Sequence, residues 1–269
     1  CAMPAEPVVA RAALHFWEEP PISGTRGAGT VFFSGCNLRC VFCQNSSISQ
    51  AGFGKPVTGE RLREIFRALI VQGAHNIDLV TPTHFTHAIL EALSEPLGVP
   101  VVWNSGGYES AETLQKLEGR VQIYLPDLKY LSSERAARYS TAPDYPAVAT
   151  AAILEMFRQT GPCQFDGEGL LKRGVLIRHL LLPGGVSEAK AVMDWVAGTF
   201  PRGSVYFSLM SQYTPLGRAA DFPEIDRRLR KSEIRAAQEY MAALDLPGYT
   251  QEETAADEAY VPAFDLTGV

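Results

Sequence analysis

The sequence predicts an α/β fold in which a parallel sheet curves into a partial (β/α)6 barrel, since it holds about six β–α units. Short apolar runs rich in β-branched and aromatic residues alternate with amphipathic helical patterns along most of the 269 residues. This alternation is typical of parallel strands joined by helical crossovers. The predicted strands also end in polar or glycine residues, and in such folds these ends form the face that carries the chemistry.

Six apolar runs supply the expected core strands, at 31–33, 76–81, 99–103, 121–125, 175–182 and 205–210. A further run at 8–15 would cover the bottom or side of the core. Helical patterns lie between and after these strands, at 58–73, 85–93, 111–117, 133–139, 146–160, 187–199 and 233–244. Thr58, Ser110 and Ser187 are the expected N-cap residues, and Gly73 is expected to end the first helix.

Neither a shift in composition nor a Ser/Gly-rich linker divides the chain, so we expect one domain. It would comprise an N-terminal lead-in (1–28), a barrel core (29–213) and a C-terminal helix with a tail (214–269). Hydrophobic residues at 46% and charged residues at 20% are typical of a globular protein with a large core.

The net charge of −6 and the lack of a basic stripe argue against a nucleic-acid partner. No apolar stretch is long enough to span a bilayer, and no signal-peptide pattern is visible. We therefore expect a cytoplasmic protein with no membrane partner.

The stretch TVFFSGCNLRCVFCQN, at 30–45, carries the sharpest signal. An apolar strand ends at Gly35, which lets the chain turn, and Cys36, Cys40 and Cys43 follow with C-x3-C-x2-C spacing. A disulfide would leave one thiol over, and a structural zinc site needs four ligands. A [4Fe–4S] cluster held by three thiolates would keep an open position on one iron. Zinc binding and a cysteine-rich loop without a ligand are the alternatives.

This spacing after a first strand, with Phe42 just before the last cysteine, resembles the signature of the radical S-adenosylmethionine (SAM) enzymes. The resemblance implies an incomplete (β/α)6 barrel of the radical SAM type. It also implies that Cys36, Cys40 and Cys43 hold a [4Fe–4S] cluster whose open iron is chelated by SAM. In that superfamily the reduced cluster cleaves SAM to methionine and a 5′-deoxyadenosyl radical, which abstracts hydrogen from a substrate.

The segment TPTH, at 81–84, stands where the superfamily has a glycine-rich motif that holds the SAM amino group. The glycines are absent here. Thr81 and Thr83 could still accept hydrogen bonds from an ammonium group through their hydroxyls and backbone carbonyls. The alternative is an N-cap and turn at the start of the next helix.

Two further strand ends supply expected SAM contacts. Asn104, Ser105 and Gly106 form a polar turn that could reach the ribose or methionine part of SAM, although a plain strand-to-helix turn explains them as well. Gln212, after the last core strand, could reach the ribose or adenine.

Asp127 and Lys129 lie two apart on an extended segment, so both side chains would face the mouth. This D-x-K arrangement resembles that of pyruvate formate-lyase activating enzyme, which implies that Lys129 binds the SAM carboxylate and that Asp127 orients SAM or binds a monovalent cation. A mutual surface ion pair is the alternative.

Arg178 shares a strand face with apolar residues, so its buried charge needs an anion, for which the SAM carboxylate is a candidate.

The motifs TPTH, WNSGGY, PDLKY, RHLLLPG and SLMSQYTP together resemble a branch of homologues of pyruvate formate-lyase activating enzyme. The resemblance implies an oxidoreductase that activates a glycyl-radical protein, with a donor such as flavodoxin or ferredoxin supplying the electron. Direct radical modification of a small molecule or peptide is one alternative, and a non-catalytic iron–sulfur or zinc module is another. Charged strand-end groups argue against the module, which would not need them.

A macromolecular substrate requires a mouth that can open. The hairpin at 163–172 and the tail beyond Tyr249 contain glycine and polar residues without regular patterns. We expect these two segments to border the groove beside the cluster.

Overall fold

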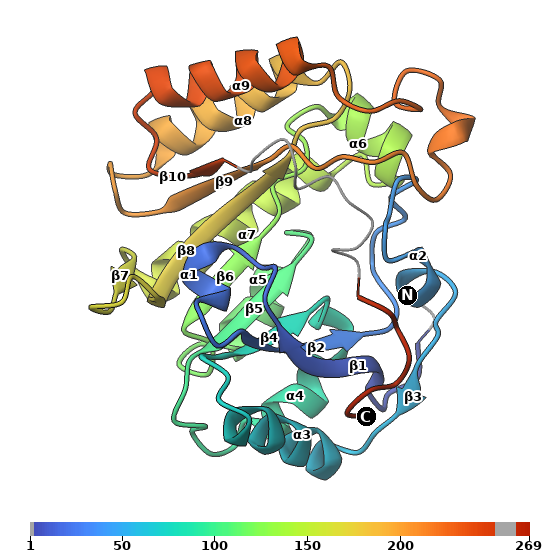
Figure 1. The fold of residues 1–269 in the computed structure, drawn as a ribbon, viewed down its shortest axis with the longest axis vertical. Helices are drawn as coiled ribbons and strands as arrows, with labels where there is room; N and C mark the ends of the chain where they lie inside the picture. The colour runs from blue at the N-terminus through green and yellow to red at the C-terminus, as the bar shows by residue number, and fades with distance from the viewer. Residues whose placement is uncertain (1–2, 251–261) are drawn as a thin grey trace.

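The computed structural model describes residues 3–250 and 262–269, and it has the predicted α/β architecture (Figure 1). Six neighbouring strands run parallel, in the order in which they follow along the chain. They are β2 (Ala28–Phe33), β4 (Ile77–Val80), β5 (Val101–Ser105), β6 (Ile123–Pro126), β8 (Leu171–Leu180) and β9 (Tyr206–Met210). This order agrees with right-handed β–α–β crossovers.

Further strands extend the sheet at both edges. β10 (Gly248–Thr250) pairs parallel with β9, while β1 (Val8–His15) pairs antiparallel with β2 and with the short β3 (Lys55–Pro56). The edge strands of the described sheet, β10 and β3, do not pair with each other, so the barrel is partial.

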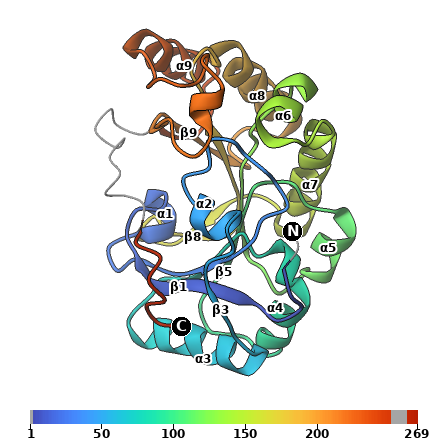
Figure 2. The ribbon, with the colours of Figure 1, turned by 90° about the vertical axis from the view of Figure 1, so that its right-hand side faces the viewer.

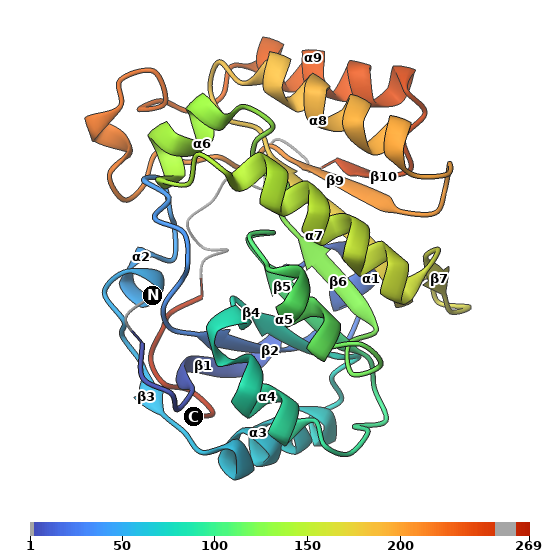
Figure 3. The ribbon, with the colours of Figure 1, turned by 180° about the vertical axis from the view of Figure 1, so that it is seen from behind.

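The helices form an arc around the outside of the curved sheet, as Figures 2 and 3 show. They are α3 (Gly59–Val71), α4 (Thr86–Ala92), α5 (Ala111–Lys116), α6 (Ser133–Ser140), α7 (Tyr145–Thr160), α8 (Val186–Thr199) and α9 (Lys231–Ala243). Short turns of helix are α1 (Pro20–Ser23), α2 (Ser46–Ser49), η1 (Thr83–Phe85) and η2 (Ala219–Asp221). None of the helices in the described ranges is both long and apolar enough to cross a bilayer.

Local signals account for several helix ends. The Thr58 hydroxyl accepts a hydrogen bond from the Arg61 amide, and the Ser110 hydroxyl accepts one from the Thr113 amide, so both predicted N-caps are confirmed. Gly73 has a φ of +100° just past α3, as expected for the residue that ends a helix.

Several predicted boundaries are wrong; β8, for example, begins at Leu171 and not at Val175, and two further errors concern a strand end and a helix cap. Strand β5 does not stop at Trp103 but runs on to Ser105, because Asn104 pairs with Val80 and Ser105 pairs with Pro126. Helix α8 begins at Val186 with Gly185 at its N-cap position, so Ser187 lies inside the first turn instead of capping it.

Alternate residues of each parallel strand face the helices and the barrel interior. Ile77 and Leu79 belong to the large core between sheet and helices, whereas Val80 faces inward. A smaller apolar cluster fills the floor of the barrel; it contains Ile22, Ala28, Val102, Ile123, Leu125, Leu171 and Leu176. The polar inward residues Thr30, Asp78 and Ser208 are buried, and they separate this floor from the mouth.

The C-terminal residues 262–269 pack along β1 (red in Figure 1). The Leu266 amide donates to the Ala10 carbonyl at 3.0 Å, and the Ala12 amide donates to the Thr267 carbonyl at 2.8 Å. The predicted tail lid falls largely on 251–261, which lies outside the described residues.

Candidate active site

The cysteine loop leaves the carboxyl end of β2 and is held by backbone hydrogen bonds. Gly35 has a φ of +85°, which favours glycine, and its amide donates to the Ile48 carbonyl at 2.9 Å. Farther along, the Arg39 and Val41 amides donate to the Ser140 and Tyr139 carbonyls. The loop thereby satisfies carbonyl groups at the C-terminal end of α6 that the helix itself leaves without partners.

The three thiols line one cavity of about 280 Å³ at the carboxyl ends of the parallel strands. Each sulfur has a polar neighbour: the Leu38 amide lies 3.4 Å from Cys36 Sγ, the Ser140 hydroxyl 3.0 Å from Cys40 Sγ, and the Ser49 hydroxyl 3.2 Å from Cys43 Sγ. These groups can donate hydrogen bonds to thiolate sulfur.

Burial raises the pKa of the Cys36 thiol to about 12 and also raises the pKa of Cys40. Iron ligation needs the thiolate, and a bound metal deprotonates its thiol ligands. The partly enclosed position and the hydrogen-bond donors suit a cluster, because both tune its reduction potential. The donor set therefore fits a [4Fe–4S] cluster with one iron left open.

No fourth cysteine joins this set among the described residues. Cys163 lies on the hairpin at the other end of β8, where its Sγ donates to the Val175 carbonyl at 3.3 Å, and Cys1 lies outside the described residues. Within 3–250 and 262–269, no three His, Cys, Asp or Glu side chains lie close enough to share one metal ion. A [4Fe–4S] cluster does not require three ligands around one ion, because each thiolate binds a different iron.

Eight of the nine predicted SAM-contact residues line the same cavity: Thr81, Asn104, Ser105, Gly106, Asp127, Lys129, Arg178 and Gln212. Thr83 does not line it. Its hydroxyl points the other way and donates to Glu109 Oε1 at 2.5 Å, since η1 turns the chain at Pro82. The turn of the alternative interpretation is present as η1, but Thr83 is not an N-cap, because neither η1 nor α4 has a side-chain cap.

Two cavity residues show features that suit ligand binding. Thr81 has a φ of +57°, in the left-handed region that a β-branched residue seldom adopts, and such strain clusters at functional sites. Gln212 Oε1 is buried and has no hydrogen-bond partner within the described ranges, so a ligand donor could satisfy it.

Arg178 is the centre of a buried network of charges. Its Nε donates to Asp127 Oδ1 at 2.9 Å, its Nη1 to Glu18 Oε2 at 3.2 Å, and its Nη2 to Asn104 Oδ1 at 2.7 Å. The sequence argument requires an anion for this buried guanidinium. The protein itself supplies three carboxylates, since Glu19 Oε2 also lies 3.9 Å from Nη1.

Lys129 joins the same network from the segment that follows β6. Its Nζ donates to Asp127 Oδ2 at 2.5 Å, and both side chains are less than one-fifth exposed. The pair is therefore a buried one and not the surface ion pair that the sequence leaves open. Burial opposes ionisation of Asp127, but the charges of Arg178 and Lys129 outweigh it and hold the pKa of its carboxyl below the usual range.

The sequence argument missed three acidic residues of this network. Glu18 and Glu19 line the cavity from the segment before α1, and Asp78 lies behind them on β4. Burial raises the pKa of Glu19 to about 7, although Arg178 opposes the shift, and burial raises the pKa of Asp78 well above its usual range. One signal for Asp78 was available: it is the only charged residue in the predicted strand 76–81, and it stands between the apolar residues Ile77 and Leu79.

If Glu19 and Asp78 carry protons, the positive and negative charges of the network balance near neutral pH. Arg178 and Lys129 carry two positive charges, and Glu18 and Asp127 are the carboxylates within hydrogen-bonding distance of them. Each uncompensated charge in a buried site is unfavourable, so neutral Asp78 and partly neutral Glu19 are the expected state.

The predicted lid at 163–172 is wrong. These residues do form a hairpin, in which β7 (Gln164–Phe165) pairs with β8 at Arg173 and Leu171. The cavity, however, lies at the other end of β8, where Arg178 and Leu180 line it. At about 3.3 Å per residue, the hairpin is roughly 20 Å from the mouth.

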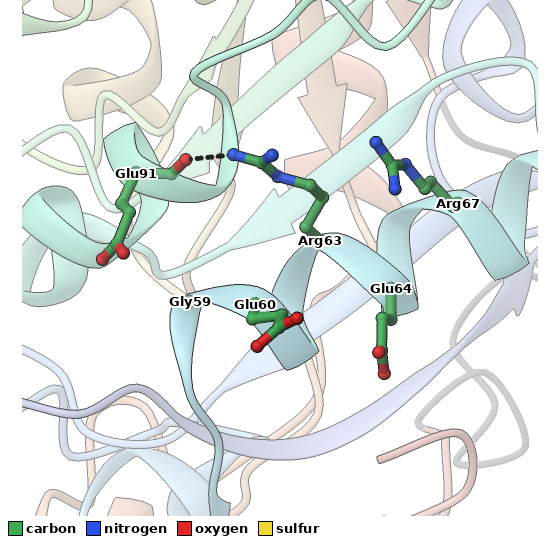
Figure 4. Close-up of a pocket in the computed structure, with 6 residues that line it drawn as sticks. All are labelled: Gly59, Glu60, Arg63, Glu64, Arg67 and Glu91. Atoms are coloured by element: carbon green, nitrogen blue, oxygen red, sulfur yellow. Dashed lines mark hydrogen bonds between the residues drawn. The ribbon is translucent and has the colours of Figure 1, made fainter.

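A second hollow lies on the outer surface between α3 and α4 (Figure 4). Glu60, Arg63, Glu64 and Arg67 line it from α3, and Glu91 lines it from α4. Arg63 donates to the Glu91 and Ala92 carbonyls and so satisfies the end of α4. The hollow carries no thiol, and we assign it no part in the chemistry.

The fold and the cavity define an α/β protein with a three-cysteine loop at the mouth of a partial barrel. Residues 30–184 match the Radical SAM superfamily model, and the chain belongs to that superfamily. Membership implies a [4Fe–4S] cluster and SAM.

The similar proteins do not indicate which substrate this protein uses. The chain is 31% identical over 236 residues to the uncharacterized protein MJ0674 of Methanocaldococcus jannaschii, covering 84% of this chain but only 64% of the relative. The fold is similar to Streptococcus suis SuiB bound to its precursor peptide SuiA (TM-score 0.57, 14% identity, 81% of this chain and 47% of SuiB). It is also similar to a spore photoproduct lyase variant (TM-score 0.56, 11% identity, 86% of this chain and 78% of the lyase).

Proposed function

We propose that this protein is a radical SAM enzyme of the glycyl-radical activating type. The observation that carries the proposal is the meeting, in one cavity, of three thiols from a single loop with the D-x-K pair Asp127 and Lys129. The pair resembles that of pyruvate formate-lyase activating enzyme, and its placement opposite the thiols suits the binding of SAM between them.

When bound and reduced, the cluster held by Cys36, Cys40 and Cys43 supplies the electron that splits SAM into methionine and a 5′-deoxyadenosyl radical. The radical would take one hydrogen atom from a glycine of the partner protein, leaving 5′-deoxyadenosine and a glycyl radical. The chain itself binds and orients SAM and keeps water from the reacting atoms.

Lys129 is the proposed ligand of the SAM carboxylate, because its ammonium group has donors beyond the one given to Asp127. Arg178 has less to offer a ligand, since its Nε and both Nη atoms already donate to protein acceptors. We therefore assign Arg178 to positioning Asp127, which in turn orients SAM or binds a monovalent cation.

The remaining contacts follow from the lining of the cavity. Asn104, Ser105 and the backbone of Gly106 would reach the ribose or methionine part of SAM, and Gln212 would accept from the adenosine. The Thr81 carbonyl and hydroxyl would accept from the SAM amino group. Phe32, Val80 and Leu180 supply apolar lining that excludes water around the radical.

The test is to incubate anaerobically reconstituted protein with dithionite, SAM and candidate glycyl-radical proteins, and to record the paramagnetic resonance spectrum. A glycine-centred doublet with one 5′-deoxyadenosine per radical is the expected result, and Cys40→Ala protein should give neither. If no protein gives the doublet while a small molecule or peptide drives 5′-deoxyadenosine formation and is itself altered, direct modification is the function instead.

A further inference from the structure

Three segments far apart in the sequence form one surface over the cysteine loop, and we call it the loop face. They are the loop itself (37–45), helix α6, and residues 214–231, which follow β9 and end at the first residue of α9. The Val41 amide donates to the Tyr139 carbonyl, and the Val41 carbonyl accepts from the Arg218 amide at 2.6 Å. Figure 1 shows α6 beside the η2 segment, at the end of the molecule away from α3.

The loop face lies directly above one of the proposed cluster ligands. Cys40 Sγ is 3.0 Å from the Ser140 hydroxyl in the last turn of α6. The preceding Tyr139 is buried, and the guanidinium groups of Arg135 and Arg138 cover its ring at 5.7 and 5.8 Å from the centroid. Cys40 therefore contacts the same helix, α6, that presents Arg138 to solvent.

The charge of the loop face is opposite to that of the whole chain. These three segments hold eight of the 24 lysines and arginines but only four of the 30 aspartates and glutamates. Arg39, Arg138 and Arg218 are exposed on it. Glu224 and Asp221 pair with Arg138 and Arg218, and Glu188 and Glu233, from outside the three segments, pair with Arg135 and Arg227. No ion pair joins Arg39 in the described part of the chain, and the basic residues still outnumber these acids. A net positive patch on a protein of net charge −6 needs an explanation.

The proposed function provides one, because reductive SAM cleavage needs an electron from outside. Outside the loop, Cys163 is the one cysteine that the described residues hold, so within 3–250 and 262–269 no second set of thiols could bind another iron–sulfur cluster. Electron transfer weakens steeply with distance, so a protein donor must dock where the cluster is nearest the surface. Complementary charge steers such short-lived, small-area encounters.

We infer that the loop face is the docking surface for an acidic, low-potential electron-transfer protein. This inference rests on the proposed function, since only a cluster-bearing enzyme needs such a donor. Arg138 and Arg218 act through their charge and do not touch the cluster ligands through their side chains, so their replacement should change the encounter with the donor and leave SAM cleavage by a small reductant intact.

The test compares two electron sources in the reconstituted holoenzyme. Arg138→Glu and Arg218→Glu reverse charges on the loop face, and Arg61→Glu on α3 is the matched control. Arg61 and Arg218 are each paired with an acid three residues later, at 2.8 and 3.0 Å, and α3 lies at the far end of the molecule. The readout is the rate of 5′-deoxyadenosine formation at limiting reduced flavodoxin, and again with dithionite.

With flavodoxin at low salt, the double variant Arg138→Glu/Arg218→Glu is expected to be slower than wild type by roughly tenfold or more, and the difference should shrink as salt screens the charges. With dithionite, the double variant and wild type should form 5′-deoxyadenosine at the same rate. Arg61→Glu should have the wild-type rate with either reductant.

Three results would overturn the inference. One is equal flavodoxin rates in the double variant and Arg61→Glu. Another is an equal loss with dithionite, which would place these arginines in the chemistry or the fold. The third is a wild-type enzyme that accepts electrons from dithionite but from neither acidic flavodoxin nor ferredoxin at any salt concentration. Failure of the proposed function itself is distinct, because dithionite would then give no 5′-deoxyadenosine at all.

Discussion

Arg178 and Asp127 are joined twice, once through side chains and once through the backbone. Arg178 Nε donates to Asp127 Oδ1 at 2.9 Å, and the Leu128 amide donates to the Arg178 carbonyl at 2.8 Å. Regular pairing of β6 with β8 ends at Tyr124 and Val175, and the isolated bridge between Asp127 and Arg178 closes the gap again at the mouth. The pair therefore fixes where the D-x-K segment leaves the sheet.

Replacing Arg178 should mainly lower the stability of the protein, whereas replacing Lys129 should mainly weaken SAM binding. Arg178→Ala leaves the Glu18 and Asp127 carboxylates buried without this cation, so the free energy of unfolding should fall by roughly 3–5 kcal/mol. Lys129→Ala leaves Asp127 paired with Arg178 and should cost less stability, but SAM binding should weaken by roughly 1.5–3 kcal/mol. Denaturant titration and calorimetric titration with SAM measure the two effects, and an unchanged SAM affinity in Lys129→Ala would remove Lys129 from the site.

Removing any one of the three loop thiols should abolish SAM cleavage. Anaerobic reconstitution of wild-type protein should give about four irons per chain. Cys36→Ala, Cys40→Ala and Cys43→Ala should each lose the cluster absorbance and form no 5′-deoxyadenosine. Cys163→Ala is the control and should retain both, since its thiol lies at the other end of β8. Full activity in Cys40→Ala would contradict the cluster assignment.

The adjacent glycines after β5 should differ in their tolerance of a methyl group. Gly107 has a φ of +75°, and a Cβ there would lie 2.2 Å from the Asp127 carbonyl oxygen, so Gly107→Ala must displace the D-x-K segment. Gly106 has no such φ, and its Cβ would meet only the Leu38 and Lys129 side chains, at 3.0 and 3.7 Å. We expect Gly107→Ala to lower both stability and SAM cleavage strongly and Gly106→Ala to have the smaller effect on stability. Thermal melts and SAM-cleavage rates would test this, and the reverse order of stability would contradict it.

The buried Glu109 should make stability fall as pH rises toward neutral. Burial raises the pKa of this carboxyl to about 7, above the value of about 4.3 for an unfolded chain. Between these values the native state keeps a proton that the unfolded state has lost, so the free energy of unfolding falls with rising pH by up to about 1.4 kcal/mol per unit. The loss is complete above pH 7, where both states are ionised.

Glu109→Gln carries no such proton and keeps an acceptor for the Thr83 hydroxyl. Denaturant titrations from pH 4.5 to 8 should therefore show the variant gaining stability relative to wild type as pH rises, with a plateau above pH 7. Glu112→Gln, at an exposed position of α5, is the control and should show no such gain. If the free energies of unfolding of Glu109→Gln and wild type changed in parallel with pH, the raised pKa of Glu109 would be refuted.

The resemblance of the loop cysteines to the radical SAM signature anticipated the family, because the C-x3-C-x2-C spacing depends only on neighbouring residues and on the strand before it. The order of strands and helices was predictable for the same reason, since apolar periodicity is a local property. The boundary errors at Ser105 and Ser187 concern ends that cross-strand pairing and turn geometry decide.

The sequence by itself determined the fold class, the cysteine loop and most of the residues that reach the mouth, because strand ends of a parallel sheet converge whatever the helices do. Only the tertiary structure decided their partners. It brought Glu18 to Arg178 across 160 positions, turned Thr83 toward Glu109, and placed the 163–172 hairpin at the far end of β8. These outcomes depend on packing between distant segments and on the unfavourable energy of an unpaired buried charge, and neither is written in any local pattern.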